Sequence, residues 1–338
     1  MTDICIGIQE PTDTAGVRRM ALLLASQLSF DETASGNLAL VVTETAKNLL
    51  KHAGGGQMIL RSLGTGEHTG IEILAIDKGP GIHDVNRCFQ DGYSTSGTSG
   101  TGLGAIARLS QAHEVYSRPG QGTLMMVQIW KRGSNGGVSA AHFLSSGVSL
   151  PMSGETECGD AWLFQDDMRC ARLTMADGLG HGPAAAVAAQ IAMETARIHT
   201  GQPLPALMER IHAALRPTRG AAIAIAEIDS VSQVLRFVGV GNIAGAIVSE
   251  SGPIRRVVSI PGTAGHQVHK IMEYTYPWDS RSNLLMHSDG LQTHWSFDGY
   301  PGLIERHPSL IAGAFYRDYS RRRDDVTVAV VREAGTER

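Results

Sequence analysis

The sequence predicts two domains, an α/β domain followed by a β-rich sandwich with flanking helices. Its 338 residues exceed the length at which one hydrophobic core usually stops growing. A polar, glycine-rich segment from Lys131 to Ala141 follows a strand-like run and has the composition of a linker. We therefore expect a first domain at residues 1–132, a linker at 133–141 and a second domain at 142–333.

In the first half, apolar runs with strand periodicity alternate with runs of helical periodicity, which is typical of an α/β domain. The expected strands lie at residues 4–8, 57–63 and 71–77, and closing strands precede the linker. Helices are expected at residues 17–28, 35–52 and 103–111.

The second half contains many short apolar runs bounded by Gly, Asp or Asn, which indicates the strands of a β-sandwich. The expected strands lie at residues 143–150, at 161–164, in a run that ends near 176, and in the segments AAIAIAEI, VLRFVGVG, GAIVSE, NLLMHSD and DVTVAVV. Two alanine-rich stretches, residues 183–199 and 205–215, are expected to form a helix pair.

Composition excludes several classes of function. A net charge of −4 leaves no basic surplus to attract nucleic acid or an anionic membrane. No stretch approaches the roughly 18 continuous apolar residues of a membrane-spanning helix, and the opening MTDICIGIQEP lacks the basic start of a signal peptide. The four cysteines show no Cys-x-x-Cys spacing, so we expect packing thiols in a reducing, cytoplasmic setting.

Glu44 and Asn48 are four residues apart in an expected helix and therefore share one of its faces. An acid and an amide at this spacing can orient a water or hydroxyl group and can offer oxygen ligands to Mg²⁺. The same pair is also compatible with an ordinary solvated helix face. The pair alone leaves both interpretations open.

Asp77 ends an apolar strand and is followed by Gly79, Pro80 and Gly81. We expect the strand end to fix the carboxylate and the glycines to let a ligand approach the backbone. An acid so placed can accept a hydrogen bond from the exocyclic amine of adenine.

A glycine-rich stretch, GYSTSGTSGTGLGAI, precedes the expected helix at Leu103. Its backbone amides could wrap phosphate groups where the chain enters the helix. A dinucleotide-binding interpretation of Gly100, Gly102 and Ala105 fits poorly, because that fingerprint should follow a strand directly.

Three segments in this order, Glu44-x-x-x-Asn48, Asp77-x-Gly-x-Gly-Ile and Gly100-Thr-Gly-Leu-Gly104, resemble the three boxes of the GHKL ATPases. This superfamily includes gyrase, heat-shock protein 90, histidine kinases and MutL. Within it, GYST and the later GQGT look most like the small anti-sigma serine kinases of the RsbT type. The resemblance covers residues 1 to about 132 and implies an α/β Bergerat (HATPase) sandwich.

This resemblance implies roles for residues of the first domain. Glu44 would be the general base, Asn48 would ligate Mg²⁺ and Asp77 would contact the adenine of ATP. The remaining nucleotide-binding residues that it implies are Gly79 and Gly81 beside Asp77, and Gly100, Thr101, Gly102, Leu103 and Gly104 around the phosphates.

Four acids of the second half lie beside turns or strand ends: Asp160, Asp177, Asp289 and Asp325. Carboxylates so placed can converge at one edge of a sandwich, where their mutual repulsion would need cations. Hard ions such as Mg²⁺ or Mn²⁺ suit an all-oxygen site, and two of them can activate a shared water against a phosphate. Each Asp-Gly pair is by itself also compatible with a simple turn.

Four motifs resemble the metal-binding motifs of type 2C protein phosphatases, in particular the bacterial SpoIIE and RsbX branch: Gly159-Asp160, Asp177-Gly178-x-Gly180-His181-Gly182, Ser288-Asp289-Gly290 and Asp324-Asp325-x-Thr327, in this order. The resemblance implies an α+β phosphatase fold, a β-sandwich flanked by helices. It implies that Asp177 bridges two Mn²⁺ or Mg²⁺ ions and that Gly178 lends its carbonyl. Asp160, Asp289 and Asp325 would complete the metal shell, partly through water.

The second domain departs from this branch at Cys158, which replaces one of the two glycines that often precede the first acid. Asp160 is therefore the least secure of the expected metal ligands. His181, inside the glycine-rich DGLGHG segment, either orients a water or leaving group or supports the turn.

Together the two resemblances imply a kinase-like domain joined to a phosphatase-like domain. In both families the substrate is a serine or threonine of a STAS-domain protein, an anti-sigma antagonist or stressosome scaffold of bacterial partner switching. We therefore expect a bifunctional switch protein that uses ATP, Mg²⁺ and Mn²⁺ to phosphorylate and dephosphorylate such partners. The alternative is a phosphoserine phosphatase whose first domain senses nucleotide or binds a partner without kinase activity.

Overall fold

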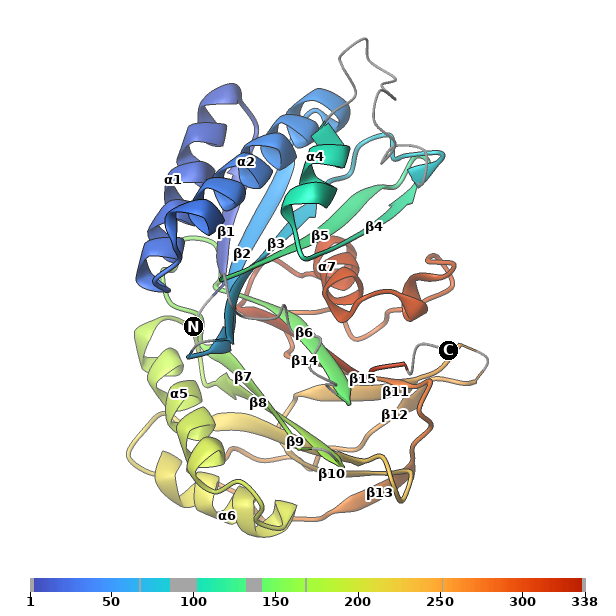
Figure 1. Ribbon diagram of the computed structural model, residues 1–338. Coiled ribbons are helices and arrows are strands. Elements are labelled where there is room, and N and C mark those ends of the chain that lie inside the picture. The colour runs from blue at the N-terminus through green and yellow to red at the C-terminus, as the bar shows by residue number, and fades with distance from the viewer. Residues whose placement is uncertain are drawn as a thin grey trace. The chain divides into compact units, whose positions relative to one another are not determined.

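A computed structural model of the chain describes residues 3–66, 68–85, 102–131, 142–167, 169–250 and 252–335. The chain divides into two compact units, chiefly Asp3–Ala140 and Ala141–Arg338 (Figure 1). The expected linker, residues 133–141, lies outside the described residues. Gly100 and Thr101, which were expected to bind phosphate, also lie outside them.

The first unit is built on one antiparallel sheet of five strands in the order β1-β2-β3-β5-β4. Three helices, α1, α2 and α4, cover one of its faces (Figure 1), and a π-helical turn, η1, extends α2. The strands are β1 (Ile4–Ile8), β2 (Gly56–Thr65), β3 (His68–Ile76), β4 (Ala112–Arg118) and β5 (Gly122–Trp130). The helices are α1 (Pro11–Gln27), α2 (Glu32–Asn48), η1 (Leu49–Ala53) and α4 (Gly102–Leu109).

Apolar side chains join the helices to the sheet in one core. Val17 of α1, Leu38 of α2 and Ile106 of α4 are fully buried, and they pack with side chains that alternate along β2 and β3, such as Met58 and Ile73. The side chains on one face of the strands and those on one face of the helices therefore form a single core layer.

Helix α1 begins at Pro11, whereas the sequence led us to expect a start at residue 17. Proline is tolerated in the first turn of a helix because its missing N–H would have no partner there. The Asp13 carboxylate accepts hydrogen bonds from the backbone N–H groups of Gln9 and Glu10, at 2.8 and 2.9 Å. These interactions hold an N-terminal turn that apolar periodicity does not reveal.

The second unit contains two antiparallel sheets of five strands each, in the orders β13-β10-β9-β8-β7 and β12-β11-β14-β15-β6. The first sheet comprises β7 (Asp160–Asp166), β8 (Cys170–Gly178), β9 (Ala221–Asp229), β10 (Val234–Val240) and β13 (Tyr274–Pro277). The second comprises β6 (Phe143–Leu150), β11 (Ala244–Val248), β12 (Arg255–Arg256), β14 (Asn283–His287) and β15 (Val326–Glu333).

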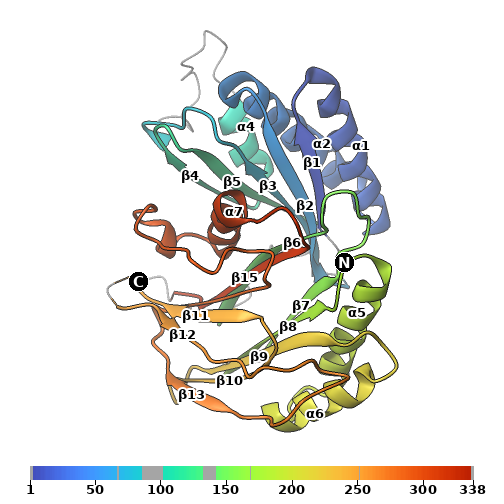
Figure 2. The ribbon, with the colours of Figure 1, turned by 180° about the vertical axis from the view of Figure 1, so that it is seen from behind.

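These two sheets form a sandwich with helices on its outer faces (Figure 2). Side chains from both sheets, such as Leu173 and Phe237 from one and Met286 and Val331 from the other, share a buried cluster. Helices α5 (Pro183–Ile198) and α6 (Leu204–Leu215) cover the outer face of the first sheet, and α7 (Pro308–Tyr319) packs on β6 and β15. A short 3₁₀ turn, η2 (Leu303–Glu305), precedes α7.

The sequence predicted a helix pair in this unit, and the structure adds α7 as a further helix. Nearly all of its residues are buried, from Pro308 to Phe315 without interruption. Burial of nearly every position leaves few polar residues to mark an exposed face, the feature by which amphipathic helices are recognised. The two-domain α/β and α+β fold class is otherwise as expected.

Candidate functional sites

Glu44 and Asn48 lie on the last two turns of α2, on one face, as their spacing predicts. The Glu44 carboxylate accepts a hydrogen bond from Lys47 Nζ at 2.9 Å, and its side chain is 32% exposed. The Asn48 Nδ2 atom is buried and has no hydrogen-bond partner among the described residues. Buried amide groups are normally paired, so this unpaired donor is consistent with a binding role for Asn48.

The start of α4 lies directly against this pair. A Cβ atom on Gly102 would be 3.4 Å from Glu44 Oε2 and 3.7 Å from Asn48 Oδ1. The first backbone N–H groups of a helix lack partners within the helix and attract anions. Tertiary packing therefore brings an acid, an amide and a helix N-terminus together from two separate sequence motifs.

Of the two remaining residues of the glycine-rich box that are described, neither is a free loop residue. Leu103 packs against the core of the first unit, and Gly104 is buried inside α4. Only the backbone N–H groups of these two residues are thus available to a phosphate group.

Asp77 is the first residue after β3 and is only 8% exposed. Its Oδ1 atom accepts the backbone N–H groups of Gly79, at 2.8 Å, and Thr123, at 3.1 Å. The strand end therefore fixes this carboxylate, as expected. Thr123 was not among the expected site residues, although it ends the GQGT segment that pointed to this family.

The glycines after Asp77 are required by the protein's own backbone. A Cβ atom on Gly79 would lie 2.6 Å from Ala53 Cα, and one on Gly81, whose φ is +72°, would lie 2.1 Å from the Arg118 carbonyl oxygen. The expected role of these glycines in ligand access stays a prediction, and the structure adds a packing requirement for both. This packing joins the end of the π-helical turn to the Asp77 segment, which builds the site.

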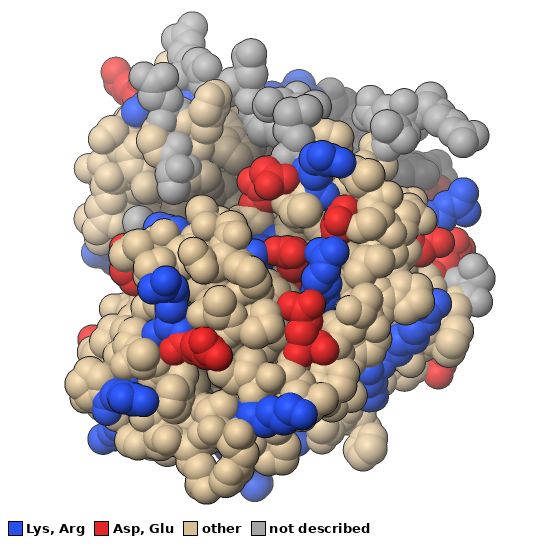
Figure 3. All heavy atoms as spheres, turned by 90° about the horizontal axis from the view of Figure 1, so that it is seen from below, with Lys and Arg blue, Asp and Glu red and all other residues tan. Residues whose placement is uncertain are grey.

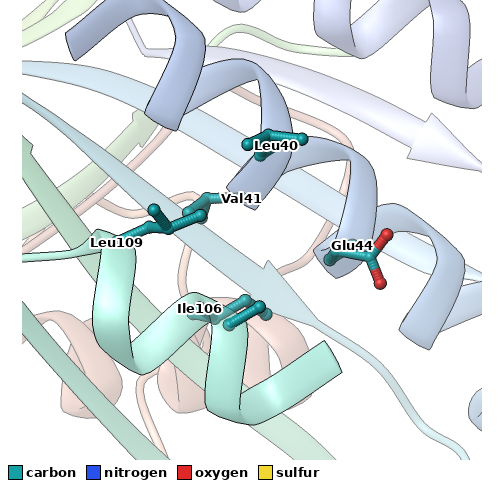
Figure 4. Close-up of a pocket in the computed structure, with 6 residues that line it drawn as sticks. Leu40, Val41, Glu44, Ile106 and Leu109 are labelled. Carbon is teal, nitrogen blue, oxygen red and sulfur yellow. The ribbon is translucent and has the colours of Figure 1, made fainter. Parts of the chain in front are cut away.

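Helices α2 and α4 enclose an open pocket of about 240 Å³ next to this site. Figure 4 shows Glu44 at this pocket with Leu40 and Val41 from α2 and Ile106 and Leu109 from α4. Glu44 is the one charged residue among the described residues that line it.

In the second unit, Asp160 and Asp177 are paired residues of neighbouring strands β7 and β8. Asp289 follows β14 by two residues, and Asp325 immediately precedes β15, which pairs with β14. The pKa of Asp177 is raised to about 9, first by burial and then by the charges of four neighbouring acids, Asp160, Asp289, Asp324 and Asp325. The carboxylates of both sheets have therefore converged, as the sequence predicted.

The pKa values of the neighbouring acids Asp160 and Asp289 are also raised. Burial raises the pKa of Asp160 to about 7, although the hydroxyl groups of Ser288 and Thr327 lower it. The Oδ2 atom of Asp160 is buried without a hydrogen-bond partner. Burial, and then the charge of Asp324, raises the pKa of Asp289. Such a group of repelling, incompletely satisfied carboxylates is stabilised by cations.

Asp325 and Asp324 differ in their surroundings. Both carboxylate oxygens of Asp325 accept backbone N–H groups, from Met152 and from Gly159, each at 2.8 Å, and the residue is 3% exposed. Asp324 is half-buried, and its charge raises the pKa of both Asp177 and Asp289. Asp325 is thus occupied by backbone contacts, whereas the half-buried Asp324, which was not among the expected ligands, is less constrained and is a further candidate for binding an ion.

Three motif glycines allow these acids to pack. A Cβ atom would meet Asp325 Oδ2 at 2.6 Å from Gly159, the Ala185 carbonyl oxygen at 2.2 Å from Gly178, and the Asp325 carbonyl oxygen at 1.9 Å from Gly290. The glycine beside each acid is therefore part of the geometry of the acid cluster.

Two further polar residues, Asn242 and His181, lie near the acid cluster. Asn242, which sequence reasoning missed, donates from Nδ2 to Asp289 Oδ2 at 2.7 Å. The exposed His181 Nδ1 lies 2.7 Å from Glu155 Oε1, across from the turn that carries it. This contact favours the turn-supporting role among the two that we considered for His181.

Among the described residues, no three His, Cys, Asp or Glu side chains are already arranged as ligands of one ion. Mg²⁺ keeps several water ligands and needs one or two carboxylates. The donor set around Asp177, all oxygen and partly unsatisfied, therefore fits hard divalent ions with water-rich shells.

Helix hydrophobicity and surface charge relate to binding of membranes and nucleic acid. In the described parts of the chain, no helix is long and apolar enough to cross a membrane. On the face shown in Figure 3, basic and acidic side chains are interspersed, and no continuous basic patch of the kind that binds nucleic acid is visible.

Comparison with known proteins gives matches in both halves. Residues 9–128 match the family described as Histidine kinase-like ATPase domain, and residues 167–333 match Stage II sporulation protein E (SpoIIE). Over 128 residues the chain is 31% identical to the serine/threonine-protein kinase RsbT of Bacillus subtilis (strain 168), covering 38% of this chain and 96% of RsbT. Over 150 residues it is 25% identical to the phosphoserine phosphatase RsbX of the same strain, covering 44% of this chain and 75% of RsbX.

Solved structures agree with these matches. A chain described under "The bacterial stressosome: a modular system that has been adapted to control secondary messenger signaling" is 30% identical with a TM-score of 0.54, covering 57% of this chain and all 100% of its own length. RsbX in complex with magnesium has a TM-score of 0.50 at 22% identity, covers 57% of this chain and 96% of its own, and supports the fold alone.

The expected resemblances to RsbT-type GHKL ATPases and to SpoIIE- and RsbX-type phosphatases are thereby confirmed. The chain belongs to the histidine kinase-like ATPase family through an N-terminal domain homologous to RsbT, and it fuses this domain to a SpoIIE-type, type 2C protein phosphatase domain homologous to RsbX.

Proposed function

We propose that this chain is a bifunctional switch protein that phosphorylates and dephosphorylates serine or threonine on STAS-domain partners in a bacterial partner-switching pathway. The observation that carries this proposal is the assembly of two separate sites, Glu44 with Asn48 and Gly102, and the acids around Asp177. The names of RsbT and RsbX, a kinase and a phosphatase, support the same pairing of activities.

In the kinase domain, Glu44 would accept the proton of the attacking hydroxyl group, and Asn48 would hold the Mg²⁺ that accompanies ATP. Asp77 contacts the adenine, with Gly79 and Gly81 shaping its segment. The phosphates lie at the N-terminus of α4, where the expected residues are Gly100, Thr101, Gly102, Leu103 and Gly104. The pocket between α2 and α4 leaves room beside Glu44 for the side chain that brings the hydroxyl group.

In the phosphatase domain, Asp177 would hold Mg²⁺ or Mn²⁺ ions together with the carbonyl oxygen of Gly178. Asp289 and Asp324 would add further oxygen ligands, and Asp160 would act mainly through water. Asp325, which the sequence also suggested as a ligand, accepts backbone N–H groups with both carboxylate oxygens and would hold the surrounding backbone in place. Such ions would supply a water of lowered pKa for attack on the phosphate.

The setting of this chemistry is the cytoplasm, and the partners are proteins. RsbT is named as a serine/threonine-protein kinase, RsbX as a phosphoserine phosphatase, and one similar solved chain is described with the bacterial stressosome, which supports a STAS-domain antagonist or stressosome protein as the phospho-substrate of this chain. Neither nucleic acid nor a membrane is a partner in this proposal.

The test uses the full-length chain with STAS-domain proteins encoded near its gene. Transfer of labelled phosphate from ATP to the unmodified partners tests the kinase, and phosphate release from the phosphorylated partners with Mg²⁺ or Mn²⁺ tests the phosphatase. We expect both activities on one or two partners. Absence of both activities on every such partner would overturn the proposal.

A second candidate function follows from the ion pair between Lys47 and Glu44. If that carboxylate stays paired, the first domain senses nucleotide or binds a partner and regulates the phosphatase without chemistry. A Glu44→Ala variant distinguishes the two, because unchanged signalling in cells favours sensing and lost signalling favours the kinase.

A further inference from the structure

An arginine outside the recognised motifs is held against the turn that carries Asp177. Arg219 lies between α6 and β9, and its Nη1 atom is 3.3 Å from the position that a Cβ atom of Gly180 would occupy. Gly180 follows Asp177 by three residues and has a φ of +86°. A side chain at Gly180 would therefore be both strained and in contact with the guanidinium group.

The backbone around Arg219 is fixed to the same turn. The N–H group of Leu179 donates to the Gly220 carbonyl oxygen at 3.0 Å, and Gly178 pairs with Ala221 across β8 and β9. Gly220 has a φ of +79°, and a Cβ atom there would lie 2.6 Å from the Ala264 carbonyl oxygen. Strand pairing on one side and close packing on the other thus place Arg219 beside the turn that follows Asp177.

Arg219 has no carboxylate partner among the described residues of this domain. Within residues 142–167, 169–250 and 252–335, other arginines pair with acids, such as Arg172 with Glu227 and Arg317 with Asp318, whereas Arg219 forms no ion pair. Its side chain is exposed. A guanidinium group that lies against the turn after Asp177 without an ion-pair partner in this part of the chain is available to an anionic ligand.

We propose that Arg219 binds the phosphoryl group of the phosphoserine or phosphothreonine substrate, an inference that rests on the proposed phosphatase function. A guanidinium group presents parallel N–H donors that match two oxygens of a phosphate, and it stays charged at any pH the protein tolerates. The acids alone would repel a phosphate dianion. Arg219 supplies donors to it from the Gly180 side of the turn, so Arg219 is a substrate-binding residue and transfers no proton.

The test compares Arg219→Ala and Arg219→Lys in the full-length chain loaded with Mn²⁺. Arg216→Ala is the matched control, because Arg216 is an exposed arginine of the same α6–β9 connection and forms no ion pair among the described residues. Calorimetry measures the affinity for inorganic phosphate and for Mn²⁺, and steady-state hydrolysis of a phosphorylated STAS-domain protein gives kcat and KM. Thermal melting confirms that each variant is folded.

We expect Arg219→Ala to weaken inorganic phosphate binding about tenfold or more and to raise KM by a similar factor, the size of a lost charged hydrogen bond. Its Mn²⁺ affinity stays unchanged, Arg219→Lys recovers part of the phosphate affinity, and Arg216→Ala behaves as wild type. Equal phosphate affinity and KM in wild type and in both Arg219 variants would overturn the inference.

The outcomes also separate this inference from the proposed function. If the wild-type chain binds inorganic phosphate through Arg219 but hydrolyses no phosphoprotein, the phosphatase proposal fails and the binding role of Arg219 stands. If the wild-type chain hydrolyses the phosphoprotein and loss of the Arg219 side chain changes neither constant, the role of Arg219 alone fails. Absence of phosphate binding by the wild-type chain overturns the role of Arg219.

Discussion

Asp160 and Asp177 are paired directly across the antiparallel strands β7 and β8, so two repelling carboxyl groups are fixed next to each other. Side chains of directly opposed strand residues share one face and interact, and like charges there are destabilising. The fold therefore maintains an arrangement that is unfavourable in the metal-free protein, and this cost identifies the acid cluster as a functional feature.

Replacement of Asp177 by asparagine should separate stability from activity. We expect Asp177→Asn to lower phosphatase activity by more than about 100-fold, because the proposed bridging ligand is lost. In the metal-free protein the melting temperature should rise by about 2–4 °C, the shift that about 1 kcal/mol produces in a domain of this size. A lower metal-free melting temperature in a calorimetric scan would contradict the repulsion described here.

The raised pKa values of the acid cluster predict a pH dependence. The pKa of Asp177 is about 9 in the folded protein and near its ordinary value of 3.8 when unfolded, so folding favours the protonated form. The resulting stability is present below about pH 4 and is lost as the pH rises toward 9. We expect the metal-free melting temperature to fall over this range and Mg²⁺ or Mn²⁺ to raise it more at pH 8 than at pH 5.

Asp177→Asn is also the control for that pH dependence. Its metal-free melting temperature should change less between pH 5 and pH 8 than that of the wild type, because one of the strongly perturbed groups is gone. An equal slope in the two proteins would show that other groups dominate the pH dependence.

Asp324 and Asp325 should behave differently when each is replaced by asparagine. Asp325→Asn should destabilise the metal-free protein by about 1–3 kcal/mol, because an amide nitrogen cannot accept the N–H group that Met152 or Gly159 donates. Asp324→Asn should leave the metal-free protein folded and weaken metal binding. Chemical denaturation and metal titration of both variants check this, and the reverse pattern would restore Asp325 as the ligand.

Gly290 should tolerate no side chain. A Cβ atom there would lie 1.9 Å from the Asp325 carbonyl oxygen, so we expect Gly290→Ala to cost about 3 kcal/mol or more. Gly299→Ala is the matched control, since nothing lies within 4 Å of its Cβ position, and we expect it to change stability by less than about 0.5 kcal/mol. Urea denaturation compares the two, and equal effects would contradict the packing argument.

Glu44→Gln should distinguish nucleotide binding from transfer. The variant keeps the shape of the side chain and removes the proton acceptor, so we expect ATP affinity to be retained while phosphate transfer falls by about 10²–10⁴-fold. Calorimetry with ATP and transfer of labelled phosphate measure the two. Undiminished transfer would show that another group accepts the proton.

The sequence predicted the helices and strands that have apolar residues on one side. It also predicted both families, because their motifs occur in the expected order along the chain. Strands β1 and β6 have the expected bounds, Ile4–Ile8 and Phe143–Leu150. The first is a short apolar run between Asp3 and Gln9, and the second ends before Pro151. Helix α7 was missed because its burial on nearly all sides removes the helical pattern.

Within the sites, the sequence predicted which residue types are present but not which contacts each residue makes. Asp324 and Asp325 are adjacent and chemically identical, and only the backbone N–H groups of Met152 and Gly159 distinguish them. Similarly, the glycines after Asp77 were expected on chemical grounds, whereas their packing requirement arises from the approach of Ala53 and Arg118 from distant parts of the chain. Such contacts depend on tertiary packing, which local sequence does not encode.

The two hydrogen bonds that Asp325 accepts from Met152 and Gly159 secure the acid-bearing end of the second domain by protein contacts alone. The two ends of the loop between β6 and β7, at Met152 and Gly159, are thereby tied to the start of β15 by the side chain of a single residue, so one substitution at Asp325 would release both ends at once.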